Sequence, residues 1–122
     1  MQAKDIMTKE VITVTSSAII KDVIKLCIEN KISGVIVVEN DEVLGVVTEK
    51  DLLVAHDFLQ DISQPIKDFI SKNIIGIDED TSVEEISRML VQRNIKRVPV
   101  VKNNKLLGIV SRRDVLRCII EK

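Results

Sequence analysis

Residues 97–114 read Arg97-Val-Pro-Val-Val-Lys-Asn-Asn-Lys-Leu-Leu-Gly-Ile-Val-Ser-Arg-Arg-Asp114. Two apolar, largely β-branched runs flank the polar pair Asn103-Asn104, which favours a β-hairpin with a tight turn. The segment Ser111-x-x-Asp114 then precedes a run with helical apolar spacing, a pattern typical of a helix N-terminus. The stretch therefore predicts a hairpin that leads directly into a helix.

The same arrangement occurs sixty-three residues earlier, without a gap, over residues 34–51. At this offset Gly45 aligns with Gly108 and Asp51 aligns with Asp114. The correspondence extends over nearly the whole chain, which a chance similarity between short apolar runs would not do. The chain is therefore a duplication.

Each copy predicts the same order of elements, β-α-β-β-α. The first copy predicts a lead-in at 3–7, a strand at 11–14, a helix at 18–30 capped at Ser16-Ser17, strands at 34–38 and 43–47, and a helix at 49–59. The second copy predicts a lead-in at 67–70, a strand at 74–77, a helix at 83–93 with a capping box of Asp80-Thr81 and Glu84, the hairpin and a final helix.

The predicted fold class is α/β (α+β), with two β-α-β-β-α repeats related by a pseudo-two-fold axis. Residues 1–60 form the first repeat, 61–66 the linker and 67–122 the second repeat. A half of about sixty residues is only marginally stable alone, because it buries too little surface. We therefore expect the two repeats to pack through their sheets into one compact module.

The composition is that of a soluble globular protein, with 45% hydrophobic and 30% charged residues. No apolar run approaches the roughly 18 residues that span a bilayer, and the N-terminus does not resemble a signal peptide. A cytoplasmic protein without membrane contact is expected. Phe58 and Phe69 are the only aromatic residues, which argues against base-stacking platforms. Cys27 and Cys118 fall at apolar helix positions and predict buried free thiols.

Charge is unevenly distributed along the chain. Residues 1–63 carry a net charge of −5 and residues 64–122 a net charge of +4. The arginines all lie in the second half: Arg88, Arg93, Arg97, Arg112, Arg113 and Arg117. This asymmetry is compatible with a preference for anions, with a solvated face, or with a dimer contact to the acidic half.

The junction between hairpin and helix has the pattern Gly-h-h-[Thr/Ser]-x-x-Asp in both copies, where h is aliphatic. In one interpretation Thr48 and Ser111 are N-caps, and the aspartates complete capping boxes. In the other, aspartate is too short for that task and remains free to bind a sugar diol. Arg112 in the first helical turn opposes the helix dipole, a penalty that a bound phosphate would reverse.

Pro99 interrupts the apolar strand that starts the second hairpin. A proline cannot donate to a β-ladder, so this strand is expected to lie at an edge or to break there. An interrupted ladder beside Ile75–Ile77 would leave backbone groups for the edge of a purine, while a simple edge strand explains the proline almost as well.

These features together resemble a tandem pair of cystathionine beta-synthase (CBS) domains, called a Bateman module. The resemblance rests on the duplication, the Arg97-Val-Pro-Val-Val strand, the two junctions and the Asp80-Thr-Ser-Val-Glu-Glu helix start. It implies a non-catalytic regulatory module that binds adenosine-containing ligands in clefts between the repeats. Such ligands include AMP, ADP, ATP, S-adenosylmethionine and NAD, and they act as regulators rather than as cofactors.

The resemblance also implies site residues. The aspartate would hold the ribose, the serine or threonine the ribose or phosphate, the strands the adenine, and Arg97 and Arg112 the phosphate. In the second copy the site comprises Ile75, Gly76, Ile77, Arg97, Val98, Pro99, Val100, Ser111, Arg112 and Asp114. A second, weaker site in the first copy comprises Ile12, Thr13, Val14, Val35, Ile36, Val37, Thr48 and Asp51. It is ranked lower because Gly34 and Glu49 replace the arginines.

Other functions find less support. His56 is the only histidine, no cluster has metal-ligand spacing, and no P-loop is present, so neither catalysis nor a metal site is expected. A nucleic-acid-binding protein and a purely structural dimerisation module remain alternatives. The expected protein is a stand-alone CBS regulator, homodimeric through its amphipathic helices, that signals to a separate effector protein.

Overall fold

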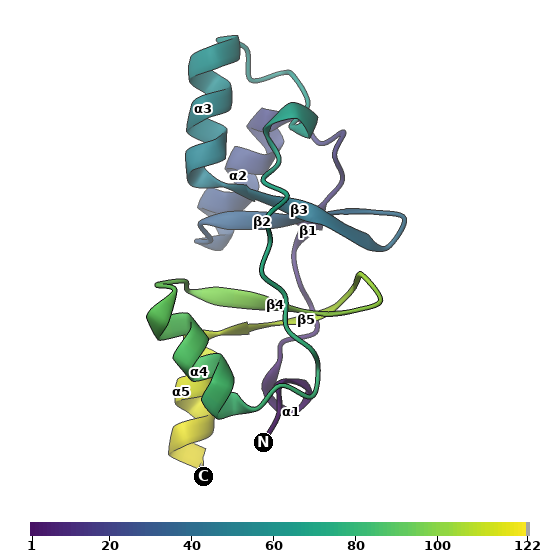
Figure 1. Cartoon of the computed structure of the whole chain (residues 1–122). Helices are drawn as coiled ribbons and strands as arrows, with labels where there is room; N and C mark the ends of the chain where they lie inside the picture. Colours follow the sequence, from purple (N-terminus) through teal and green to yellow (C-terminus); the bar gives the residue numbers. More distant parts are fainter. Residues whose placement is uncertain (122) are drawn as a thin grey trace. The chain divides into compact units, whose positions relative to one another are not determined.

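The structure is a computed structural model that describes residues 1–121. The chain divides into two compact units. Unit 2 is the continuous segment Ile12–Ile74, and unit 1 combines Met1–Val11 with the chain from Ile75 onward. Figure 1 labels the helices and strands of both units.

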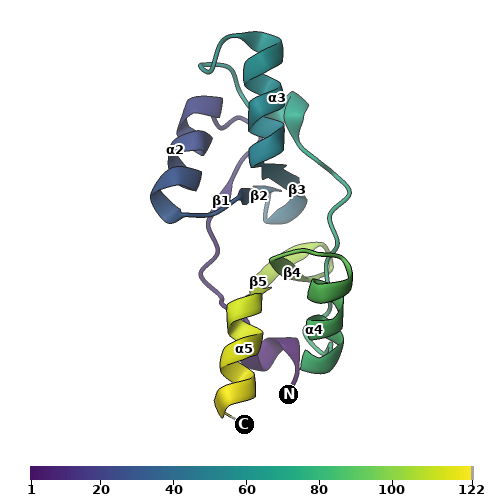
Figure 2. The same ribbon diagram turned by 90° about the vertical axis from the view of Figure 1, so that its left-hand side faces the viewer.

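Unit 2 contains three strands covered on one face by two helices (Figures 1 and 2). Its elements are β1 (Thr13–Val14), α2 (Ile20–Asn30), β2 (Gly34–Glu39), β3 (Glu42–Thr48), α3 (Glu49–Leu59) and the 3-10 turn η1 (Lys67–Phe69). Strand β1 runs parallel to β2, and β2 runs antiparallel to β3. The buried core between strands and helices consists of Ile20, Val23, Cys27, Val35, Val37, Val47, Leu52, Ala55 and Ile66.

Unit 1 contains a hairpin, two long helices and a short one. Its elements are α1 (Ala3–Ile6), α4 (Val83–Gln92), β4 (Arg97–Lys102), β5 (Lys105–Ser111) and α5 (Arg112–Glu121). Helix α4 presents a buried stripe of Val83, Ile86 and Leu90 at helical spacing. Burial of each such side chain contributes about 1.5–3 kcal/mol. The core of the unit consists of Ala3, Ile77, Val83, Ile86, Leu90, Val98, Val100, Val110, Val115 and Cys118.

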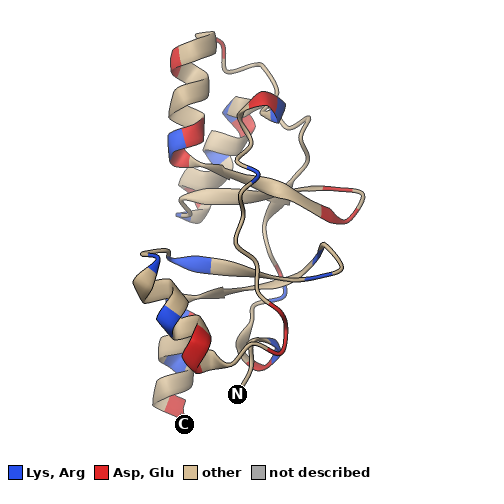
Figure 3. Cartoon of the chain, viewed as in Figure 1, with Lys and Arg blue, Asp and Glu red and all other residues tan. Residues whose placement is uncertain are grey.

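The predicted mixed class, both hairpins and the four main helices are confirmed. Helix α3 spans the predicted residues, Glu49–Leu59. Both hairpin turns place two consecutive residues at positive φ, Asn40-Asp41 and Asn103-Asn104. Asparagine and aspartate tolerate this left-handed conformation, which suits the two-residue turns of hairpins. Figure 3 shows that the β2–β3 turn is acidic and the β4–β5 turn basic, in line with the charge asymmetry of the sequence.

The compact units differ from the predicted repeats because each unit contains the lead-in of the other copy. The segment 61–66, predicted as a linker, belongs to unit 2, where Ile66 is fully buried. The N–H of Ile66 donates to the carbonyl of Ala18, and that of Ile20 to Gln64, both at 2.9 Å. In unit 1, Ala3 is fully buried and its N–H donates to Thr81 at 2.8 Å. Periodicity marked these lead-ins as apolar but carried no information about which core they enter.

Two helix caps differ from the prediction. Ile19 is the N-cap of α2, and Ser16 instead donates through its N–H and hydroxyl to Glu39. The N-cap of α4 is Ser82, whose hydroxyl accepts from the N–H of Glu85 at 3.2 Å, so the predicted box of Asp80-Thr81 with Glu84 is wrong. Each region offers several adjacent polar residues, and the sequence does not indicate which one reaches the free N–H groups.

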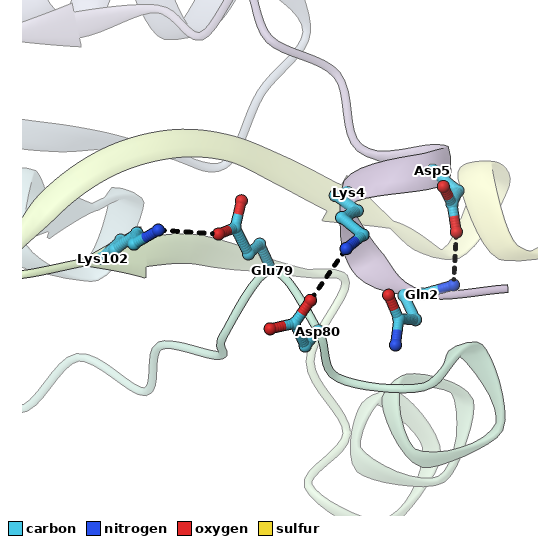
Figure 4. A network of polar contacts seen from close by, with 6 residues as sticks. All are labelled: Gln2, Lys4, Asp5, Glu79, Asp80 and Lys102. Carbon is cyan, nitrogen blue, oxygen red and sulfur yellow. Dashed lines mark hydrogen bonds and ion pairs between the residues drawn. The ribbon is translucent and has the colours of Figure 1, made fainter.

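Ion pairs join the lead-in and β4 of unit 1 to the turn before α4 (Figure 4). Lys4 lies 3.0 Å from Asp80, and Lys102 lies 3.1 Å from Glu79. The hydrogen bond to Asp80 raises the pKa of Lys4 above its ordinary value. Both pairs lie at the surface, with side chains 30–68% exposed, so each adds little to stability.

Among residues 1–121, no helix is both long and apolar enough to cross a membrane. Cys27 and Cys118 are buried and free, one in each unit. Burial raises the pKa of the Cys27 thiol, which makes it less reactive.

Candidate functional site

Ser111 and Asp114 form a capping box at the start of α5. The N–H and the hydroxyl of Ser111 donate to Oδ2 of Asp114 at 2.8 and 3.0 Å. In return, the N–H of Asp114 donates to the Ser111 hydroxyl at 3.2 Å. Thr48 and Asp51 make the same three hydrogen bonds at the start of α3. The capping interpretation of the two junctions is therefore confirmed.

This geometry corrects one step of the sequence argument. The aspartate reaches back to the cap N–H, so its carboxylate is not left entirely free. An ionised carboxylate has about four lone pairs, and the two bonds from Ser111 both use Oδ2. The Asp114 side chain is only 7% exposed. The site thus holds a buried carboxylate whose Oδ1 is not engaged in capping.

Arg117 is a neighbour of Asp114 that the sequence analysis missed. Its terminal nitrogen lies 3.4 Å from Oδ1, one helical turn along α5. The i,i+3 spacing of opposite charges on a helix is the sequence signal that could have identified this contact. In the first copy the corresponding residue is Val54, and the hydroxyl of Ser71 lies 3.2 and 3.1 Å from the two Asp51 oxygens. The two equivalent carboxylates therefore have different neighbours.

A cavity of about 300 Å³ lies beside Asp114, along α1 and α5. Its lining residues are Met1, Asp5, Ile6, Asp114, Arg117, Cys118 and Glu121. Asp114 is the one predicted site residue among them. The wall combines three carboxylates with one guanidinium, so the net charge at this cavity is negative.

The β4 residues of the predicted site fall into two groups. Val98 and Val100 are fully buried in the core of unit 1, so their side chains are directed away from any ligand. Pro99 lies between them and faces the other side of the strand, because side chains alternate along a strand. All three residues are therefore buried in the described chain, Pro99 on the face opposite to the two valines.

Pro99 also shortens the strand predicted at 74–77. In unit 2, β1 pairs with β2 at two positions, Thr13 with Ile36 and Val14 with Val37. In unit 1 the pair equivalent to Val14 and Val37 is an isolated bridge between Ile77 and Val100. A rung between Gly76 and Pro99 would need an N–H from the proline, which has none. In a parallel ladder the carbonyl of Ile75 would accept this hydrogen bond, so Pro99 provides it with no donor.

The two candidate phosphate ligands are placed differently. Arg112 donates through Nε to the carbonyl of Ile95 at 3.0 Å, and through Nη2 to Leu90 at 3.4 Å and Asn94 at 3.3 Å. It thus binds the carbonyl end of α4, which is where a cation is favoured. Arg97 pairs with Ser111 across the hairpin, and paired residues share a face of the strand. Nε of Arg97 is buried without a hydrogen-bond partner among the described residues.

The predicted residues of the first copy form a more complete β-structure. Val35 and Val37 are buried in the core of unit 2, and Ile36 is 5% exposed. Thr13 and Val14 pair along β2, and Ile12 is 37% exposed. The ladder is not interrupted as it is in unit 1, so fewer backbone groups are available here.

The glycines of the two junctions have a role that the sequence analysis missed. A Cβ at Gly108 would lie 2.8 Å from the carbonyl oxygen of Thr8, and one at Gly45 would collide with that of Ser71. Thr8 bridges to Ile109 and Ser71 bridges to Val46. The glycine therefore makes room for the lead-in that crosses β5 or β3. Within residues 1–121, no three potential metal ligands lie close enough together to hold an ion.

Comparison with known proteins identifies this arrangement. The sequence model of the CBS domain matches residues 3–57 and 66–121. The chain is 30% identical to inosine-5'-monophosphate dehydrogenase of Methanocaldococcus jannaschii over 118 residues, covering 95% of this chain and 23% of the enzyme. This chain is also 30% identical to the protein MJ1232 of the same organism, and it covers 38% of that protein. The chain thus spans less than half the length of these two curated relatives.

Two solved structures have the same fold. CBSX2, determined in complex with AMP, is 27% identical with a TM-score of 0.85, over 98% of this chain and 96% of that one. The CBS domain pair of MJ0100, determined in complex with 5'-methylthioadenosine and S-adenosyl-L-methionine, is 28% identical with a TM-score of 0.78, over 99% and 97%. This chain belongs to the CBS domain family and carries two CBS domains in tandem.

Proposed function

We propose that this CBS domain pair is a non-catalytic regulatory module that binds an adenosine-containing ligand at Asp114 of unit 1. The observation that carries the proposal is the buried Asp114 carboxylate, whose Oδ2 is fixed by Ser111 and which lies in the wall of a cavity of about 300 Å³. A fixed, buried carboxylate is a suitable acceptor for sugar hydroxyls, since its orientation is set before the ligand arrives. The AMP complex of CBSX2 and the S-adenosyl-L-methionine complex of MJ0100 support this ligand class.

We place the adenine and the phosphate at two groups of unit 1, the Ile75 carbonyl and the Arg97 guanidinium. The Ile75 carbonyl, which lacks its rung at Pro99, suits the amino group of adenine. The buried Nε of Arg97 suits a phosphate oxygen, because a buried donor without a partner is costly and a phosphate would satisfy it. We assign Arg112 no phosphate role, since its guanidinium donates to the carbonyl of Leu90 in α4 and to that of Ile95.

We rank the Asp114 site above the Asp51 site. Asp51 already accepts from Ser71 at both oxygens, and Glu49 in the first turn of α3 repels a phosphate. The complete β1–β2 ladder also leaves fewer backbone groups for a base. The second site is therefore weak, empty, or adapted to a less charged ligand.

The module has exposed apolar side chains on its helices that suit association. Leu53 and Phe58 on α3 are 70% and 77% exposed, and Ile120 on α5 is 84% exposed. We propose that the chain forms a homodimer through such helices and passes its signal to a separate effector protein. Analytical ultracentrifugation of Phe58→Glu and Ile120→Glu tests the dimer, which at least one of these charges should dissociate.

A thermal-shift panel at fixed salt tests the ligand proposal. It compares AMP, ADP, ATP, S-adenosylmethionine and NADH with the adenine-free control CMP, on the unmodified chain and on two variants. Asp114→Asn keeps an acceptor for the Ser111 N–H and loses the charge, and Asp51→Asn is the matched control. A ligand at 100 times its Kd stabilises by about 2.7 kcal/mol, which is several degrees or more for a domain of this size.

We expect one or more adenosine ligands to raise the melting temperature, with the shift lost in Asp114→Asn and retained in Asp51→Asn. Equal losses in both variants would contradict the ranking of the sites. A panel in which no adenosine ligand exceeds CMP would refute the proposal and leave the Ser-x-x-Asp segments as helix caps alone.

A further inference from the structure

The outward face of α3 carries two apolar side chains between two opposite charges. Leu53 and Val54 are 70% and 49% exposed, whereas the buried residues of α3 face the core of unit 2. Lys50 and Asp57 are exposed as well. Positions 50, 53, 54 and 57 follow the i, i+3, i+4, i+7 spacing of one helix face. This face therefore has an apolar centre, with a cation toward its N-terminal end and an anion toward its C-terminal end.

Neither charge is explained by the helix that carries it. The helix dipole disfavours a cation in the first turn and an anion in the last turn, and these are the positions of Lys50 and Asp57 in α3. Within residues 1–121, neither side chain takes part in an ion pair. Both charges are therefore available to a partner outside the chain.

The face is self-complementary about a two-fold axis. When two copies of α3 lie antiparallel with the axis between Leu53 and Val54, their residues pair in reverse order across the contact. Leu53 then meets Val54 of the second copy, and Lys50 meets Asp57 of the second copy, once on each side of the axis. Each charge also lies near the end of the neighbouring helix whose dipole favours it. A second copy thus reverses the unfavourable placement of both charges.

Helix α5 of the second repeat provides an internal comparison. Its equivalent face is also exposed and consists of Arg113, Leu116, Arg117 and Ile120. In the same antiparallel register each arginine meets an apolar residue of the second copy, and the two copies of Arg117 lie next to the axis. A mixed pair of α3 with α5 joins Asp57 to Arg113 but leaves Lys50 and Arg117 facing no anion. Only the pair of α3 helices matches every charge on the face with its opposite.

We propose that two copies of the chain associate through α3 of unit 2, about a two-fold axis between Leu53 and Val54, with two symmetric ion pairs between Lys50 and Asp57. This inference rests on the homodimer of the proposed function and deepens it, because it names the face, the symmetry and the residues that select a second copy. Burial of the apolar centre supplies the affinity, and the ion pairs set the register and the orientation.

Sedimentation equilibrium of charge-reversed chains tests this interface without any ligand. The proteins are the unmodified chain, Lys50→Glu, Asp57→Lys and an equimolar mixture of these two variants. The homodimer of Lys50→Glu contains two pairs of acidic residues, and that of Asp57→Lys contains two pairs of basic residues. In the mixed dimer both pairs join opposite charges. Each substitution suits the dipole of α3, so a loss of association does not come from a weakened helix.

Arg113→Glu is the matched control, because Arg113 occupies the position of Lys50 in α5. We expect each reversal on α3 to raise the Kd of the dimer by at least about tenfold, since like charges then face each other twice. The Kd of the mixed dimer and that of Arg113→Glu should both lie within about threefold of the parent value.

Three results would overturn the inference while leaving the proposed homodimer in place. They are single reversals that dimerise like the parent, a mixture that associates no better than its components, and a Kd raised about tenfold by Arg113→Glu. The third result would point instead to a mixed pair of α3 with α5. A monomeric parent would refute the homodimer together with this inference, and the thermal-shift panel would still decide nucleotide binding separately.

Discussion

Gly108→Ala tests the crossing of the N-terminal lead-in over β5. A new Cβ would lie 2.8 Å from the carbonyl oxygen of Thr8 and 2.9 Å from Sδ of Met7. Thr8 cannot retreat freely, because its N–H and carbonyl each make a 2.9 Å hydrogen bond with Ile109. In an open strand the same change would be stabilising by roughly 0.5–1 kcal/mol, since glycine loses more backbone entropy. The sign of the effect therefore distinguishes a crowded site from an open one.

Overpacking of this kind costs about 1–3 kcal/mol, and each lost backbone hydrogen bond about 1 kcal/mol. We expect Gly108→Ala to lower the free energy of unfolding by about 2 kcal/mol, and the melting temperature by roughly 8 °C. Urea unfolding followed by circular dichroism measures this change, with an unaltered m-value as the check on two-state behaviour.

Gly34→Ala is the matched control, because its nearest contact is at 3.1 Å and the next at 3.5 Å. It should cost less than Gly108→Ala. Combining Gly108→Ala with Met7→Ala removes the sulfur contact but not the Thr8 carbonyl, so it should restore only part of the loss. If Gly108→Ala were as stable as the parent, or no less stable than Gly34→Ala, the close packing of the N-terminal lead-in against β5 would be refuted.

Three further predictions concern single side chains. The hydrogen bond from the Ser16 hydroxyl lowers the pKa of Glu39 below 4.5, so its stabilising effect is complete above pH 4.5 and is lost as the pH falls through the lowered value. Urea midpoints of Ser16→Ala should therefore fall below those of the parent at about pH 6 and converge with them once the pH falls below the lowered pKa of Glu39; a gap that widens in acid would contradict this sign. Arg112→Met should lose about 1 kcal/mol of stability in urea melts, through its bonds to the end of α4, with nucleotide Kd changed by less than about threefold. Pro99→Val supplies an N–H for the Ile75 carbonyl, so titration should show nucleotide binding weakened by about tenfold with the fold retained; unchanged binding would remove that carbonyl from the site.

The elements of this fold were predictable because their signals are local. The Asn-Asp and Asn-Asn turns and the helical apolar spacing act within a few residues, and the 63-residue duplication presents each signal twice. Helix α3 begins and ends where expected. The capping boxes were also recognisable from Thr48-x-x-Asp51 and Ser111-x-x-Asp114. The sequence alone does not show that an aspartate reaches back to the cap N–H, as Asp51 and Asp114 do.

The remaining features depend on long-range packing. The lead-ins cross between copies because Ala3 and Ile66 enter the other core, and no local pattern specifies that choice. The same packing buries Val98 and directs Arg112 to α4 rather than to a ligand. Arg117 was within reach of sequence reasoning through its i,i+3 spacing from Asp114, but the resemblance to the family drew attention to the motif residues instead.

Calorimetric titration of the chain with the nucleotide that gives the largest thermal shift tests whether the Asp114 carboxylate binds the ligand. The measurement is repeated on Asp114→Asn and Asp51→Asn under the same salt conditions. We predict one strong site per chain, a loss of at least about tenfold in affinity for Asp114→Asn, and a change of less than about threefold for Asp51→Asn. Equal affinity for the parent and Asp114→Asn would contradict the assignment of nucleotide binding to the buried carboxylate of unit 1.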